Sequence, residues 1–174
     1  MKILLILDHD RFKDDYLSIA QDAAPHVDLL WYRIKGVPDC EIYKRAIALR
    51  TALPHATLIL SERADIATAA NFQGVHLNAN TPPPAVIKGA FPELLVGYSA
   101  HSVEECRIAA DYITLSPIFH TAKPYEVHPL GVIPAPAANV YALGGVSASN
   151  INLLKSCGYL GVAGISLYNE LPFS

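Results

Sequence analysis

Three basic residues stand where an apolar run gives way to a polar turn. Arg33 and Lys35 lie at the end of the apolar segment 27–34, and Lys123 follows the segment 112–119. Arginine offers a planar fork of N–H donors to phosphate oxygens, and lysine acts as a point charge. The three bases therefore suit a polyanion, although Arg33 and Lys35 are also spaced like the solvated face of an edge strand.

Two glycine-rich stretches, ALGGVSASN (142–150) and GVAGIS (161–166), contain the ends of two later apolar runs. Their backbone amides would meet little side-chain obstruction, which suits a phosphate group. A lone Gly-Gly pair is equally typical of a simple turn. Two anion sites would indicate two phosphorylated substrates, or one substrate with a phosphate at each end. The residues concerned are Gly144, Gly145, Ile165 and Ser166.

Other apolar runs also end in polar residues. These are Ser61 and Glu62; His76, Asn78 and Asn80; Ser99 and His101; and His120 and Thr121. Simpler interpretations exist: Ser61 and Ser99 could cap the helices that follow, and His76 is best interpreted as a hydrogen-bonded core histidine. The acids and histidine at 8–10 resemble metal ligands, but we expect solvated loop residues there.

The elements that must position these residues alternate along the chain. Short β-branched runs predict strands over 3–7, 27–34, 56–61, 74–77, 94–99, 112–119, 139–145 and 160–166. Between them, helical patterns cover 14–24, 40–53, 63–72, 82–91, 102–110 and 147–157. Most of the strands are apolar on both faces, which is typical of a parallel sheet covered by helices.

Strict alternation of strand and helix leaves two α/β architectures, a doubly wound open sheet or a closed (β/α)8 TIM barrel. Eight strands favour the barrel, although 174 residues is short for it. The segment 126–138 is too rich in proline for a long helix, and 167–174 allows at most one turn. We therefore expect a single domain over 1–174, a minimal barrel with a degraded helix six and a nearly absent helix eight. The polar strand ends would then meet on one rim.

Composition limits the partners. Apolar residues make up 52% of the chain and charged residues 17%, which argues against disorder. The net charge of −3 gives no general attraction to nucleic acid or acidic membranes. Three widely spaced cysteines, and no stretch of transmembrane length, favour a cytoplasmic protein. Without helix eight the barrel wall would expose an apolar patch, so a homodimer is expected.

Several segments together resemble the thiamine phosphate synthase and TenI-like superfamily. YRIKG (32–36) is similar to the family's Gln-Leu-Arg-x-Lys, with Trp31 in place of Gln. GYSAHS (97–102) matches Gly-x-Ser-Ala-His-Ser, and DYITLSPIFHTAKP (111–124) resembles Asp-Tyr-x-x-x-Gly-Pro-x-Phe-x-Thr-x-x-Lys, shortened by one. SERADIATAANFQGVHLNAN (61–80) and the two glycine-rich stretches follow in family order.

The resemblance implies a (β/α)8 barrel and one of two reactions. The synthases join hydroxymethylpyrimidine diphosphate to a thiazole phosphate, releasing pyrophosphate with the help of Mg²⁺. The TenI branch isomerises a thiazole carboxylate phosphate. By matching position, Arg33, Lys35 and Lys123 would hold the diphosphate beside Thr121, and Ser99 would face the pyrimidine. Amides at Gly144, Gly145, Ile165 and Ser166 would hold the thiazole phosphate, with Ser61 as a further substrate contact.

The sequence departs from the family at the metal site. One of two Mg²⁺-binding aspartates is replaced by Glu62, and the other falls where Asn80 or Thr81 offers a neutral oxygen. The histidine of the tautomerases is replaced by Pro117, and His120 or His101 is the candidate acid or base in its place. Synthase-like condensation is the leading hypothesis. Tautomerisation is the alternative, and a non-catalytic binder of thiazole phosphate or thiamine phosphate is the third.

Overall fold

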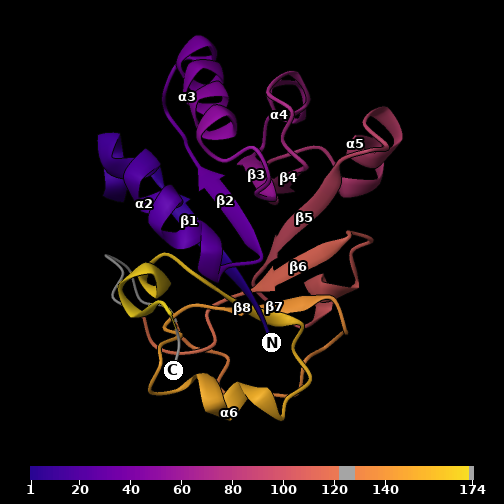
Figure 1. Cartoon of the computed structure of the whole chain (residues 1–174). Coiled ribbons are helices and arrows are strands. Elements are labelled where there is room, and N and C mark those ends of the chain that lie inside the picture. The colour runs from indigo at the N-terminus through magenta and orange to yellow at the C-terminus, as the bar shows by residue number, and fades with distance from the viewer. Residues whose placement is uncertain (122–127, 173–174) are drawn as a thin grey trace.

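The chain folds as a closed barrel of eight parallel strands, seen in a computed structural model that describes residues 1–121 and 128–172 (Figure 1). Lys123 lies outside the described residues. The strands are β1 (Lys2–Asp8), β2 (Leu29–Arg33), β3 (Leu58–Ser61), β4 (Gly74–Leu77), β5 (Leu95–Ala100), β6 (Tyr112–Leu115), β7 (Val140–Leu143) and β8 (Gly161–Gly164).

The strands pair in chain order, and β1 closes the barrel by pairing with β8, from Lys2 opposite Gly161 to Leu5 opposite Gly164. The predicted barrel is therefore confirmed, and the open sheet is excluded. The sixth strand is shorter than predicted: it ends at Leu115 rather than continuing through 119. Pro117 has no N–H to donate to a neighbouring strand, so the ladder cannot extend past it.

Side chains alternate between the inside and the outside of the barrel. On β2, Leu30 and Tyr32 belong to the large apolar cluster between strands and helices, whereas Trp31 belongs to the cluster inside the barrel. The inner cluster consists of Leu4, Ile6, Leu29, Trp31, Ile59, Tyr112, Tyr141 and Ala163. Fully burying a large apolar side chain contributes about 1.5–3 kcal/mol. The interior of the barrel is thus a packed core.

The α-helices lie outside the strands (Figure 1). They are α1 (His9–Phe12), α2 (Tyr16–Ala23), α3 (Asp39–Ala52), α4 (Ala64–Ala69), α5 (Pro84–Ala90) and α6 (Ile151–Lys155), with 3₁₀ turns η1 (Lys13–Asp15), η2 (Ala24–His26), η3 (Glu104–Arg107) and η4 (Ser166–Glu170). In α3, the spacing of Ile42, Ala46 and Leu49 places all three on the buried face. The helix predicted over 40–53 therefore forms and packs on the barrel through these residues.

One predicted helix is wrong in type. The segment 102–110 forms only the 3₁₀ turn η3, because Ile108 leaves the helical conformation for extended backbone. The chain must then return at once to the start of β6, where the Asp111 N–H donates to the Val96 carbonyl. A helix continuing to 110 would not leave enough chain for that return.

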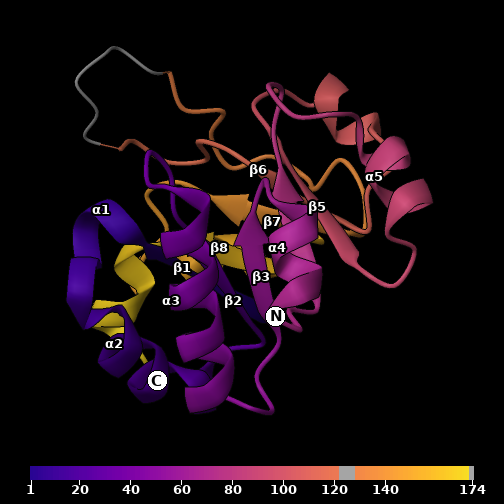
Figure 2. The same cartoon turned by 90° about the horizontal axis from the view of Figure 1, so that it is seen from above.

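The two predicted reductions in helix content are confirmed. Residues 128–139 contain no helix, and they dock instead through hydrogen bonds such as Ala135 N–H to the Cys157 carbonyl, 2.8 Å. After β8 the only helical element in the described chain is η4. It lies beside α1 and α2 in both views (Figures 1 and 2), where the Tyr168 ring meets Phe12 edge-on at 6.1 Å. No helix among the described residues is long and apolar enough to cross a membrane.

We predict that Gly161→Ala destabilises the barrel by about 1–3 kcal/mol, the typical cost of forcing atoms into a packed core. A Cβ at Gly161 would lie 2.2 Å from the Lys2 carbonyl oxygen and 2.7 Å from the Tyr141 ring, at the seam between β1 and β8. The measurement is the free energy of unfolding in urea. The matched control is Gly89→Ala in α5, where nothing lies within 4 Å. That change should stabilise by about 0.5–1 kcal/mol, and equal effects of the two would contradict the packing argument.

Candidate functional site

A cavity of about 910 Å³ lies at the carboxyl ends of the strands. The structure brings together ten of the predicted site residues as its lining: Arg33, Lys35, Glu62, Ser99, His120, Thr121, Gly144, Gly145, Ile165 and Ser166. Ser61 is buried and does not line the cavity. The last predicted residue, Lys123, falls outside the described chain.

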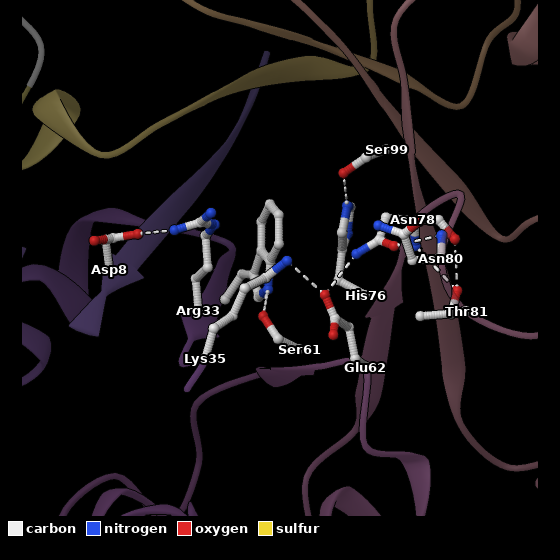
Figure 3. A network of polar contacts seen from close by, with 11 residues as sticks. Asp8, Arg33, Lys35, Ser61, Glu62, His76, Asn78, Asn80, Thr81 and Ser99 are labelled. Atoms are coloured by element: carbon white, nitrogen blue, oxygen red, sulfur yellow. Dashed lines mark hydrogen bonds and ion pairs between the residues drawn. The ribbon is translucent and has the colours of Figure 1, made fainter. Parts of the chain in front are cut away.

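Glu62 is held toward the cavity by two partners and by its backbone. Lys35 Nζ lies 2.6 Å from Glu62 Oε1, and the Asn78 side-chain amide donates to the same oxygen at 2.5 Å (Figure 3). Glu62 has a φ of 63°, in the left-handed region that costs a non-glycine residue about 1 kcal/mol or more. Its N–H is fixed by the His76 carbonyl at 3.0 Å. The chain thus maintains a strained residue where a carboxylate faces the cavity.

Asp8 corrects the sequence-based expectation of a solvated loop residue. It is the last residue of β1, its side chain is only 7% exposed, and it forms an ion pair with Arg33 on the neighbouring strand (Figure 3). The register that places Asp8 opposite Arg33 creates this pair. The available clue was that Asp8 ends an apolar strand, as the other site residues do.

Trp31 and Ser61 lie beneath the cavity rather than on its rim. The Trp31 indole N–H donates to Ser61 Oγ at 2.9 Å, and the indole stacks on the His76 ring with 3.7 Å between centroids. Ser61, which the sequence suggests as a substrate contact, is buried, and its hydroxyl accepts from the indole. The indole lines the cavity with its N–H already used, so it presents an apolar, fixed surface.

His76 is the core histidine that the sequence indicates, being 1% exposed. Its Nδ1 lies 2.9 Å from the Tyr112 hydroxyl and its Nε2 2.9 Å from Ser99 Oγ. Burial, and secondarily the charge of Lys35, lower the pKa of His76 to about 3. The ring is therefore neutral near pH 7, with one nitrogen donating and the other accepting. In this way it fixes the hydroxyl of Ser99, which faces the cavity.

The loops after β7 and β8 present backbone to the cavity. Gly144 and Gly145 have φ values of 96° and 67°, and a Cβ on Gly145 would lie 2.5 Å from the His120 carbonyl oxygen. The Asn150 side-chain amide donates to the Gly145 carbonyl at 2.8 Å and accepts from the Ser147 N–H at 2.9 Å. This bracing fixes a narrow glycine turn at the cavity wall, the usual phosphate-binding sector of the fold.

The side-chain hydroxyl of Thr121 is a second feature that indicates a ligand in the cavity. Its Oγ1 is buried and has no hydrogen-bond partner in the part of the chain that the structure describes. Buried hydroxyls normally find a partner, and Thr121 lines the cavity. A ligand oxygen in the cavity would supply one.

In the described chain, the side chains present supply only the smallest number of carboxylate ligands with which Mg²⁺ is usually bound. Within the described ranges, no three His, Cys, Asp or Glu residues gather to hold a metal ion. Glu62 supplies one carboxylate, whereas Asn78 Oδ1 already accepts from the Asn80 N–H at 2.8 Å. Mg²⁺ often binds through one or two carboxylates together with substrate phosphates. Glu62 with a bound diphosphate would meet that requirement.

Sequence reasoning missed one charged lining residue altogether. Arg11, in the short helix α1, lines the cavity beside the predicted residues. The sequence offers little to mark it, because Arg11 lies three residues beyond the end of β1. His101, noted from the sequence as a strand-end residue, also lines the cavity.

Comparisons with known proteins agree with this geometry. The family model described as "Thiamine monophosphate synthase" matches residues 3–167. The chain is 36% identical to the "Putative thiamine-phosphate synthase 2" of Aquifex aeolicus, over 97% of this chain and 98% of that one. It is 31% identical to the thiamine-phosphate synthase of a Hydrogenobaculum strain, over 94% and 84%. A solved thiamine phosphate pyrophosphorylase from Pyrococcus furiosus superposes with a TM-score of 0.78 at 27% identity, covering 95% of this chain and 85% of that one.

We predict that His76 makes the fold sensitive to acid. Its folded-state pKa of about 3 lies below the ordinary value near 6.5 in an unfolded chain. Between these values the unfolded state binds more protons, so the free energy of unfolding falls as pH drops through that window. The contribution of one such group is at most about 1.4 kcal/mol per pH unit.

The measurement is urea unfolding at several pH values from 7 to 4. His76→Gln should show a shallower loss of stability with acid than the wild type, because its side chain has no proton to gain. The control is His26→Gln, a change at an exposed position, which should keep the wild-type slope. An unchanged slope in His76→Gln would contradict the prediction.

Proposed function

Because the chain belongs to the thiamine monophosphate synthase family, we propose that it catalyses the synthase condensation. In this reaction hydroxymethylpyrimidine diphosphate and a thiazole phosphate are joined, and pyrophosphate is released. The observation that carries the proposal is that basic side chains and glycine-rich backbone line the same cavity, Arg33 and Lys35 in one sector and Gly144 and Gly145 in another. That arrangement supports binding of two phosphorylated substrates with their rings between the two sectors.

The first step we propose is departure of the diphosphate. The bond between the pyrimidine methylene carbon and the diphosphate oxygen breaks, and its electron pair leaves with the diphosphate. Arg33 and Lys35 provide positive charge fixed before the reaction begins, which is the most effective way to stabilise a leaving anion. Lys123, outside the described residues, is proposed as a third base on the strength of the resemblance. The thiazole nitrogen then donates its lone pair to the carbon, so no protein base is needed.

The neutral core beneath the cavity suits this chemistry. His76 stays uncharged and Trp31 keeps its N–H on Ser61, so neither presents a proton to the electron-poor pyrimidine. Ser99, held by His76, is proposed to contact the pyrimidine or the leaving group. Thr121 is proposed to satisfy its buried hydroxyl on the diphosphate.

Mg²⁺ is proposed as the cofactor, with Glu62 as its protein ligand. When bound, it would neutralise part of the charge on the diphosphate. Glu62 is paired with Lys35 and Asn78, so the lysine holds the carboxylate in place and also carries charge toward the same substrate.

Tautomerisation is the second candidate, favoured by the two imidazoles of His101 and His120 at the cavity. One acid or base near neutral pH would suffice for that reaction. A binding-only role would follow if a single carboxylate holds Mg²⁺ too weakly. The three functions differ in which substitution stops turnover.

We predict that Arg33→Ala reduces condensation by about 10²- to 10³-fold, the typical cost of losing one preorganised charge contact. The assay supplies both substrates to the full chain, with and without Mg²⁺, and follows thiamine phosphate. Lys123→Ala should be similarly severe, and His120→Ala should change the rate little. Glu62→Gln should raise the Mg²⁺ concentration needed for half-maximal rate.

The matched control for lost positive charge is Arg107→Ala in η3, away from the cavity. The tautomerase alternative predicts the reverse order, with His120→Ala or His101→Ala severe and no dependence on Mg²⁺. Wild-type protein that turns over neither substrate set but binds thiazole phosphate would leave only the binding role.

We also propose that the protein is a cytoplasmic homodimer. Support comes from free cysteines and from exposed apolar side chains, Val132 and Leu153, on either side of β7 in the chain, where helix cover is short. Light scattering at micromolar concentration should give twice the 18.8 kDa of one chain. Leu153→Glu should shift the equilibrium toward monomer. A monomeric wild type would contradict the proposal.

A further inference from the structure

The basic side chains that line the cavity differ in whether they are paired with a carboxylate. Within the ranges 1–121 and 128–172 its lining includes three basic side chains, Arg11, Arg33 and Lys35. Arg33 is paired with Asp8, and Lys35 is paired with Glu62 at 2.6 Å. A carboxylate partner offsets much of the attraction that a base exerts on an incoming anion. The unmatched positive charge of the described lining therefore belongs to Arg11.

Arg11 is exposed but its position is constrained. Its guanidinium carbon lies 5.7 Å from the centroid of the Phe12 ring, a cation–π distance. The Phe12 ring is itself braced against Tyr168 of η4. Within the described chain, Arg11 has no ion pair with a carboxylate. The Arg11 guanidinium can therefore bind an anion without first breaking an ion pair with a carboxylate.

Asp8 contacts the backbone of one arginine and the side chain of the other. One of its oxygens, Oδ1, accepts the backbone N–H of Arg11 at 3.1 Å, and the other, Oδ2, is paired with Arg33. The same carboxylate thus caps α1 and orients the arginine of β2. Because Asp8 is nearly buried, this junction fixes the backbone of Arg11 beside the side chain of Arg33, and both arginines line the same cavity.

We propose that Arg11 is an additional binding residue for the diphosphate group, contacting its outer phosphate while Arg33 and Lys35 bind the rest of the group. The substrate class is a diphosphate ester, so this inference rests on the proposed function for the organic part of the ligand. The charge argument itself needs only two linked phosphates. A monophosphate bound at the glycine turn of β7 lies in another sector and should be indifferent to Arg11.

The direct test is isothermal titration calorimetry of the full-length protein with inorganic pyrophosphate and, separately, with inorganic phosphate. Arg11→Ala should weaken pyrophosphate binding about tenfold, the lower end expected for losing a charge-assisted contact at an exposed position. Arg11→Lys should fall between, because lysine keeps the charge and loses the fork. Arg107→Ala, which removes an exposed arginine outside the cavity, should bind as the wild type does.

Steady-state kinetics separates this inference from the proposed function. Arg11→Ala should raise KM for the pyrimidine diphosphate, with a smaller change in kcat and none in KM for the thiazole phosphate. If the wild type binds pyrophosphate through Arg11 but forms no thiamine phosphate, the proposed function is overturned and the inference about Arg11 stands. Active Arg11→Ala protein with wild-type pyrophosphate affinity and wild-type KM would overturn the binding residue alone. Failure of the wild type to bind pyrophosphate at millimolar concentration would also overturn it.

Discussion

Closure of the sheet between β1 and β8 is the constraint on which the site depends. Eight parallel strands that close on themselves must all present their carboxyl ends to the same rim. Residues as distant in sequence as Asp8 and Ser166 therefore share one end of the molecule. Closure also imposes the registers that set Asp8 opposite Arg33 and Ser61 opposite His76. The first register produces the ion pair between Asp8 and Arg33 at the rim. The second places Ser61, which accepts the indole N–H of Trp31, beside His76, on whose ring the indole stacks.

The interior of the barrel has a further role, which is to make the bottom of the cavity rigid and neutral. Trp31, His76 and Tyr112 are stacked or tilted against one another, with hydrogen bonds that occupy the indole N–H and both imidazole nitrogens. A buried polar network in which the members satisfy one another specifies a single arrangement. Ser99 gains a fixed position from it, although the residues that hold it come from three different strands.

The rim, by contrast, is organised by charge. Two of its bases are held by carboxylates, and Glu62 is held in a backbone conformation that glycine would adopt more readily. Such strain is commonly kept at functional sites. The result is a set of side chains positioned before a ligand arrives, which reduces the ordering that binding would otherwise require.

The sequence by itself determined the barrel, the reductions in helix content and most of the cavity lining. Alternation of apolar runs with helical patterns is a local property, and the position of a polar residue at a strand end is visible without coordinates. What only the tertiary structure decided was the pairing between strands. Asp8 was interpreted as a loop residue because its partner, Arg33, is 25 positions away, and no local pattern links the two.

The same reason explains Ser61 and Arg11. The sequence placed Ser61 at a strand end but not beneath Trp31, because the direction of a side chain there depends on what the neighbouring strands present. Arg11 follows a strand by three residues, and only the short helix α1, capped by Asp8, returns it to the cavity. Local patterns specify which elements form, whereas contacts between distant residues decide which side chains meet.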